Sequence, residues 1–224
     1  MMKRIKSGID GLDPLIEGGF IEGSVNLVTG GTGTGKTIFS SQYLWEGLKK
    51  GESCIYITME ESPEAIKQDA SLFGWDFQKF EDQGIFKIIY HDPAQVNNIG
   101  SVIIDEISTL KAKRLVIDSI AVMGMVIGED SQIRRRIMNI ISTLKRVGCT
   151  SIILSEIPEG SNALSRFGIE EFAVDGVIVL NYLGIGGLEA RSMMVRKMRG
   201  TNHGKDTYPF DITSTGIVVK NTDL

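Results

Sequence analysis

Residues 30–37, GGTGTGKT, decide the fold of this chain together with the residues on either side of them. The preceding run SVNLVT, residues 24–29, is apolar on both faces and has the length of a buried strand. The following segment, KTIFSSQYLWEGLKK, repeats its apolar residues with the period of one helix face. The pattern GxxxxGK[ST] between a strand and a helix is typical of a phosphate-binding loop. This stretch therefore predicts an α/β fold built around an anion site.

The loop has the residue types that phosphate binding requires. Glycines let the backbone wrap tightly, so that several N–H groups and the helix N-terminus face the phosphates. Lys36 would reach the β- and γ-phosphates, and the Thr37 hydroxyl would bind Mg²⁺. The alternative is a glycine-rich turn that contains a lysine by chance. Such a turn would have no need of a strand directly before it and a helix directly after it. We expect the nucleotide to contact Gly30, Gly31, Thr32, Gly33, Thr34, Gly35, Lys36, Thr37 and Ile38.

The rest of the chain repeats the alternation of strand and helix. Apolar runs at 53–59, 85–90, 114–119 and 150–156 are separated by segments of helical period, including 101–112 and 131–147. Four strands with short links follow, at 176–182, 190–198, 208–213 and 216–220, which is typical of antiparallel pairing. We predict one RecA-type P-loop domain over residues 1–224. Its mostly parallel central sheet is flanked by helices and ends in antiparallel C-terminal edge strands.

Composition indicates a globular protein without a membrane span. The 224 residues are 42% hydrophobic and 23% charged, and no apolar run reaches the ~18 residues of a membrane helix. The N-terminus has basic residues without an apolar stretch behind them, so it is not a secretory signal. Cys54 and Cys149 both begin buried runs, and reduced core thiols are favoured over a disulfide between them. We therefore expect a cytoplasmic protein.

Carboxylates follow two of the predicted strands. Asp118 closes the run RLVID and would complete the magnesium shell opposite Thr37, unless it only caps a helix. Glu60 and Glu61 close the run at 53–59, and either could position or deprotonate the attacking water. The alternative for the glutamate pair is a solvated turn. The acidic residues thus predict a hydrolytic centre at the carboxyl edge of the sheet.

A basic cluster lies near the C-terminus, in VRKMRGTNHGK at residues 195–205. The net charge of the chain is −4, so this concentration of positive charge is local. Charges on an edge strand can discourage pairing with other sheets. Beside a phosphate-binding loop, they can instead meet the phosphates of a nucleotide.

These motifs resemble those of the KaiC-like proteins within the RecA superfamily of ATPases. The resemblance runs over nearly the whole chain, from SGIDGLDPLIEGGFIEGSVNLVTGGTGTGKT through MEES, FGWDF and LVIDS to KMRGTNHGKDTYPFDIT. A phosphate-binding loop alone is common to many NTPases. The glutamate pair together with KMRGTNH is far more specific to this group.

The resemblance implies ATP with Mg²⁺, held between neighbouring subunits. Glu60 would be the water-activating base and Glu61 its supporting neighbour, so that the catalytic set is Glu60, Glu61, Lys36 and Arg199. Arg199 would act on the neighbour's ATP as an arginine finger. The residues expected to contact that ATP are Lys197, Met198, Arg199, Thr201 and His203, with Lys205 near them.

Two departures from the family pattern limit what is carried over. Ile21 stands where the family commonly has proline, which affects the shape of one turn. Glu170 and Glu171, in GIEEF, match the domain of the two-domain clock protein that is not phosphorylated. Autokinase activity is therefore not expected.

Two functions follow as expectations. The first is a slow ATPase whose homo-oligomeric ring, hexameric by resemblance, acts as a regulatory switch read by a protein partner that the sequence does not name. The second is a DNA-binding accessory of recombination or repair. For the second, the candidate DNA-binding loops at 123–131 and 157–170 carry a single basic residue, Arg166, and the arginine run at 134–136 is more often a solvated helix face.

Overall fold

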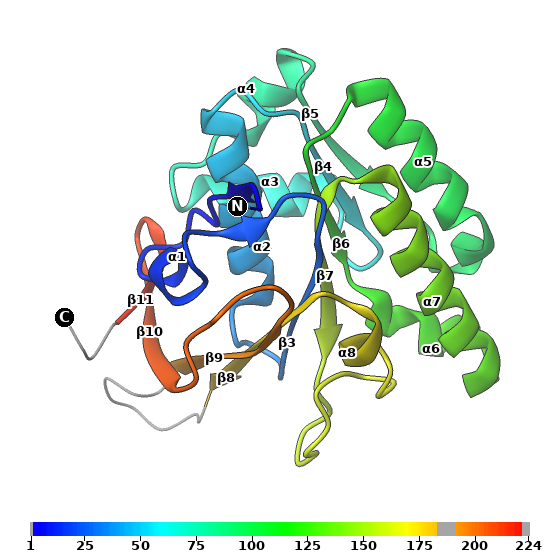
Figure 1. Cartoon of the computed structure of the whole chain (residues 1–224). Helices are drawn as coiled ribbons and strands as arrows, with labels where there is room; N and C mark the ends of the chain where they lie inside the picture. Colours follow the sequence, from blue (N-terminus) through cyan, green and yellow to red (C-terminus); the bar gives the residue numbers. More distant parts are fainter. Residues whose placement is uncertain (1, 183–190, 221–224) are drawn as a thin grey trace.

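A nine-stranded sheet forms the centre of the molecule (Figure 1). The structure is a computed structural model and describes residues 2–182 and 191–220. The strand order is β11-β10-β9-β8-β3-β7-β6-β4-β5. A separate two-stranded sheet pairs β1 (Arg4–Ile5) with β2 (Phe20–Ile21) near the N-terminus.

Six neighbouring strands of the large sheet are parallel. They are β3 (Val25–Gly30), β4 (Cys54–Thr58), β5 (Phe86–Tyr90), β6 (Arg114–Asp118), β7 (Thr150–Glu156) and β8 (Gly176–Tyr182). Strands β3, β4 and β6 are buried at every residue, because helices cover both faces of the sheet. The predicted α/β fold is confirmed, and the carboxyl ends of these strands meet at one edge.

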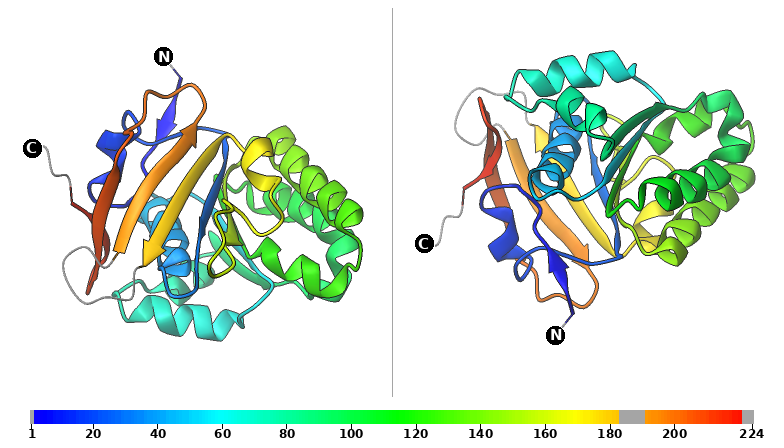
Figure 2. Two further views of the ribbon diagram at one scale, coloured as in Figure 1. Left: turned by 90° about the horizontal axis from the view of Figure 1, so that it is seen from below. Right: turned by 90° about the horizontal axis from the view of Figure 1, so that it is seen from above.

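Helices cover the two faces of the sheet (Figure 2). One face packs against α1 (Leu12–Leu15), α2 (Lys36–Lys49), α3 (Pro63–Ser71) and α4 (Phe77–Asp82). The other packs against α5 (Ile99–Leu110) and α7 (Asp130–Val147), whose isoleucines recur on one side of each helix. Short helices η1 (Pro93–Asn98), η2 (Ile120–Val122), α6 (Met123–Val126) and α8 (Glu170–Ala173) connect the larger elements.

Three antiparallel strands extend the sheet, as predicted. They are β9 (Arg191–Met198), β10 (Thr207–Thr213) and β11 (Gly216–Val219). Ala190, with which we expect the first of them to begin, lies outside the described residues. Gly176 of β8 is level with Met198 of β9, and Tyr182 is level with Arg191, so β9 runs along the whole of β8.

Two expectations are corrected by the structure. Segment 123–131 is not a continuous loop, because α6 occupies its start and α7 begins at Asp130. The disulfide alternative is wrong, since Cys54 and Cys149 are both free and buried. Burial raises the pKa of the Cys54 thiol well above its usual range and that of Cys149 to about 12, so both are core thiols. Among the described residues, no helix is long and apolar enough to cross a lipid bilayer.

Candidate nucleotide site

The loop after β3 has a conformation that its glycines make possible. Gly33 and Gly35 have φ values of 73° and 97°, in the left-handed region that other residues avoid. The Thr34 hydroxyl donates to the carbonyl of Gly31 at 2.9 Å and closes the turn. Helix α2 begins at Lys36, so its free N–H groups point into the loop, as an anion site requires.

The Lys36 amine lies against this loop. It donates to the carbonyls of Gly30 at 3.0 Å and of Gly31 at 2.9 Å. Burial lowers the pKa of Lys36, and the negative charges of Glu156, Asp118 and Glu60 oppose that shift. A lysine amine in a glycine-rich loop is suited to bind phosphate oxygens, whereas the carboxylates beside it are suited to a divalent cation that accompanies the phosphates.

Asp118 ends β6 opposite the start of α2. Its Oδ2 accepts hydrogen bonds from the Thr37 hydroxyl at 3.3 Å and from the Tyr56 hydroxyl at 2.5 Å. Burial raises the pKa of this carboxyl to about 6, although the hydrogen bond from Tyr56 opposes the shift. A hydroxyl and a carboxylate side by side fit Mg²⁺, which prefers oxygen ligands and takes the rest from water and phosphates. Asp118 thus accepts side-chain hydroxyls, whereas the N-cap of the helix that follows it, η2, is Ser119.

Glu60 and Glu61 follow β4 in a turn held by Thr58. The Thr58 hydroxyl accepts the backbone N–H groups of Glu60 at 3.3 Å and Glu61 at 3.1 Å, and donates to the carbonyl of Glu61 at 2.9 Å. The Ser119 hydroxyl, which follows Asp118, donates to Oε1 of Glu60. The pKa of Glu61 is raised by burial and by the charges of Asp69 and Glu60.

Two hollows lie beside these groups. The P-loop cavity, about 340 Å³, is lined by Gly33, Gly35, Lys36, Thr37, Ile38, Ser41, Glu61, Ile66, Asp69, Ala70, Phe73, Trp75, Arg191 and Ile212. The acidic hollow, about 420 Å³, is lined by Glu60, Glu156 and Arg166 together with Met59, Pro93, Ala121, Val122, Gly124 and Met125. The glutamate pair thus divides between them, with Glu61 in the first and Glu60 in the second.

The basic cluster lies at the opposite end of the sheet. Asn26 and Gly176 are level in the parallel pair β3–β8, and Met198 is level with Gly176 across β9. Gly30, where the phosphate-binding loop starts, is four residues further along β3, or about 13 Å at the rise of a strand. Lys197 and Arg199 are therefore remote from the loop of their own chain.

Both side chains contact helix α8 and its surroundings. The Lys197 amine donates to the carbonyls of Glu171 at 2.9 Å and Val174 at 2.7 Å, and burial together with Arg199 lowers its pKa. Arg199 is 56% exposed and makes an ion pair with Asp175 at 3.5 Å. Asp175 also accepts the amine of Lys145 at 2.7 Å. The charged ends of both predicted cations therefore contact their own chain, although the arginine is still largely open to solvent.

The remaining predicted residues of this edge have structural contacts. The Thr201 hydroxyl accepts Nη1 of Arg4 at 3.0 Å, and Nδ1 of His203 lies 2.8 Å from the carbonyl oxygen of Gly204. Met198 is the last residue of β9 and its side chain is buried, whereas Lys205 is exposed.

Glu170 and Glu171 belong to a buried cluster behind this edge. Glu170 is fully buried and accepts the hydroxyls of Ser155 at 3.0 Å and Ser165 at 2.8 Å. Ser165 also contacts the carboxylate of Glu171. Because Ser155 precedes Glu156 in β7, this cluster joins the P-loop end of the sheet to α8.

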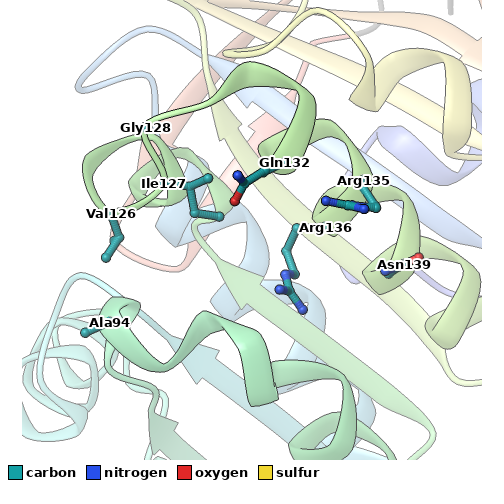
Figure 3. Close-up of a pocket in the computed structure, with 8 residues that line it drawn as sticks. All are labelled: Ala94, Val126, Ile127, Gly128, Gln132, Arg135, Arg136 and Asn139. Atoms are coloured by element: carbon teal, nitrogen blue, oxygen red, sulfur yellow. The ribbon is translucent and has the colours of Figure 1, made fainter.

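The arginine run at 134–136 lies on α7, away from the P-loop cavity. Arg134 and Arg135 are exposed and Arg136 is half-buried. Arg135 and Arg136 line a separate hollow of about 310 Å³ with Gln132, Asn139, the loop at 126–128 and Ala94 (Figure 3). The run is therefore partly built into a concave surface and is not uniformly solvated.

Two residues of the site were missed by reasoning from the sequence. Glu156 ends β7 at the same edge as Asp118. A carboxylate at the end of an apolar run is the same signal that identified Asp118, so Glu156 could have been found in the same way. Arg191 opens β9 and reaches the P-loop cavity, but it belongs to no motif, and only the strand register reveals its position.

Comparisons with known proteins agree with this fold. A family model described as the KaiC ATPase matches residues 5–223. A UPF0273 protein of Pyrococcus furiosus is 39% identical over 98% of this chain and 94% of its own length. The circadian clock protein KaiC3 of Synechocystis is 31% identical over 97% of this chain, which spans 46% of that protein. The crystal structure of a KaiC-like protein of Pyrococcus horikoshii has a TM-score of 0.90 and 41% identity, covering 99% of this chain and 100% of that one.

Proposed function

This chain belongs to the KaiC family of ATPases, and from that premise we propose that it binds ATP with Mg²⁺ and hydrolyses it slowly between the subunits of a homo-oligomeric ring. The ring, hexameric by family resemblance, would be a cytoplasmic switch whose state a protein partner reads. The observation that carries the proposal is the separation of Arg199 from the P-loop of its own chain.

The P-loop side of each subunit would hold the nucleotide. The backbone of residues 30–37 and the amine of Lys36 would bind the phosphates, and Thr37 and Asp118 would hold the metal. Magnesium, when bound, neutralises charge on the phosphates. Glu60, which the Ser119 hydroxyl orients, would accept the proton of the attacking water, and Glu61 would support it.

The opposite edge would complete the site of the next subunit. The acidic hollow presents Glu60 and Glu156. The opposite edge, which we call the finger edge, presents Lys197 and Arg199. The two surfaces are therefore complementary in charge. A head-to-tail contact between unlike surfaces of identical chains closes into a ring when its rotation allows. In that contact Arg199 would stabilise charge on the neighbour's γ-phosphate. Phe172, exposed on α8 beside it, gives the same edge an apolar surface.

Mixing two inactive variants tests the shared site. Lys36→Ala and Arg199→Ala proteins are each expected to be nearly inactive. In rings formed from equal amounts of both, roughly a quarter of the interfaces would combine an intact P-loop with an intact finger, so the mixture should regain up to about that share of wild-type turnover. Phosphate release measures the turnover, and co-purification of the untagged variant with the tagged one shows that mixed rings form.

Arg166 provides the matched control. It lines the acidic hollow from the same chain as the P-loop and is the competing source of an arginine. Arg166→Ala should keep most of its turnover. If Arg166→Ala is inactive, and mixed rings of Lys36→Ala and Arg199→Ala recover nothing, the arginine acts within one subunit and the proposal fails.

A further inference from the structure

Tyr56 brings a hydroxyl group to Asp118 from inside the core. It lies in the middle of β4, and Thr58 of the same strand is level with Asp118 in the parallel pair β4–β6. Tyr56 is fully buried and belongs to the core cluster on the α2 side of the sheet. From there its hydroxyl reaches the carboxyl edge and donates to Oδ2 of Asp118 at 2.5 Å.

The hydrogen of the Tyr56 hydroxyl is directed to this carboxylate. Ser40 of α2 also places a hydroxyl beside it, with an Oγ to Oη distance of 3.5 Å. The Ser40 hydroxyl donates to the carbonyl of Thr37 at 3.0 Å, so its own hydrogen is already used. The Thr37 hydroxyl donates to the same oxygen of Asp118 as Tyr56 does, at 3.3 Å. Two hydroxyls on one carboxylate oxygen fix the orientation of that side chain.

A second buried tyrosine shows a different use of such a hydroxyl in the same core. Tyr43 of α2 is also fully buried, and its hydroxyl donates to the backbone carbonyl of Thr150 at 2.9 Å. That bond joins α2 to β7 and is a structural one. Phenylalanine would fill the space of either ring without burying a polar group, so the acceptor explains each hydroxyl. For Tyr56 the acceptor is the carboxylate that fits the metal.

We propose that Tyr56 is a positioning residue for magnesium, whose hydroxyl holds the Asp118 carboxylate in the orientation that the metal requires. The inference rests on the proposed function, because it assumes that Thr37 and Asp118 hold the metal of a bound nucleotide. Tyr56 acts only through Asp118 and is itself neither a ligand of the metal nor a contact of the nucleotide. It would thus tune the affinity for the metal without taking part in the chemical step.

The variant Tyr56→Phe removes the hydroxyl and leaves the ring in place. The free Mg²⁺ concentration for half-maximal turnover at saturating ATP should rise roughly ten- to a hundredfold, with kcat restored at high Mg²⁺. Electron paramagnetic resonance of Mn²⁺, bound together with a non-hydrolysable analogue of ATP, should show the same loss of metal affinity without any turnover. Isothermal titration with ATP in the presence of EDTA should give the wild-type affinity.

The matched control is Tyr43→Phe, which deletes the same group from an equally buried ring. Both variants should unfold at somewhat lower urea concentrations than the wild type, but Tyr43→Phe should keep the wild-type affinity for Mn²⁺. Asp118→Asn tests the route of the effect. If Tyr56 acts through Asp118, the double variant Tyr56→Phe/Asp118→Asn should bind Mn²⁺ no more weakly than Asp118→Asn alone.

Several outcomes would overturn the inference. They are wild-type metal affinity in Tyr56→Phe, equal losses in Tyr56→Phe and Tyr43→Phe, additive losses in the double variant, and ATP binding that is weakened as much in EDTA as in Mg²⁺. Failure of the proposed function is distinguishable from these, because it concerns the wild type. The wild-type protein would then neither bind Mn²⁺ together with the analogue nor need Mg²⁺ for turnover.

Discussion

At the scale of single residues, Glu60 and Glu61 are neighbours with different surroundings. Thr58 fixes the turn that separates them, and Ser119 holds the carboxylate of Glu60 at the acidic hollow. Glu61 instead faces Asp69 across the P-loop cavity, and the pKa of Glu61 is raised by burial and by that charge. A carboxylate that a hydroxyl orients is well prepared to hold a water molecule in a fixed position.

We therefore expect Glu60→Gln to bind ATP normally and to hydrolyse it ~10²- to 10⁴-fold more slowly, because the amide cannot accept a proton. Glu61→Gln is the isosteric comparison and should lose less. Turnover is measured as phosphate release, and affinity by titration with ATP. If Glu61→Gln is the slower of the two proteins, the roles of the glutamates are reversed.

At the scale of elements, helix α2 is fixed to the sheet by the side chain of Arg114. This fully buried arginine donates to the carbonyls of Lys6 at 2.9 Å and Tyr43 at 2.8 Å, and its Nε pairs with Glu52 at 2.5 Å. Gly47 makes room for it. A Cβ at position 47 would lie 2.5 Å from Nε of Arg114 and 3.0 Å from Sγ of Cys54.

Gly47→Ala should therefore destabilise the protein, although alanine is normally the better residue in a helix. We expect the free energy of unfolding to fall by ~1–3 kcal/mol, as for overpacked cores. Gly100→Ala in α5 is the matched control, because a Cβ there meets nothing within 4 Å, and it should be neutral or stabilising by up to ~1 kcal/mol. Urea unfolding measures both. A stabilised Gly47→Ala protein would show that Arg114 moves freely.

The elements also explain which parts of the structure are predictable from the sequence. Strands such as β4 and β6 are mainly apolar on both faces and therefore stand out as short apolar runs in the sequence. Helix α7 repeats isoleucine with helical period. Both signals are local. Met125 and Val126 are exposed and do not continue a pattern with helical period, so the sequence predicts a loop where the structure has α6. Arg191 and Arg199 lie near opposite ends of the sheet because of the register of β9 on β8, a long-range property that no local pattern encodes.

At the scale of the whole molecule, the two halves of the expected active site face in opposite directions along the sheet. The P-loop, Asp118 and Glu60 lie at the carboxyl ends of the parallel strands, and Arg199 lies at their amino ends. Asp175 ties Arg199 to Lys145 of α7 and accepts the backbone N–H of Val25 at 3.0 Å, where β3 begins. These contacts hold Arg199 at the amino ends of the strands of its own subunit, away from the P-loop.

Turnover per chain should consequently rise with protein concentration until every site has a neighbour. Light scattering on the same samples should show oligomers forming over the same range, and Arg199→Ala should assemble without gaining activity. Single-stranded DNA should leave turnover unchanged, because segments 123–131 and 157–170 carry only Arg166 to neutralise phosphates. Constant turnover at concentrations where the chain is monomeric would mean that one subunit completes its own site. Stimulation by DNA would instead direct attention to the hollow at Arg135 and Arg136 on α7.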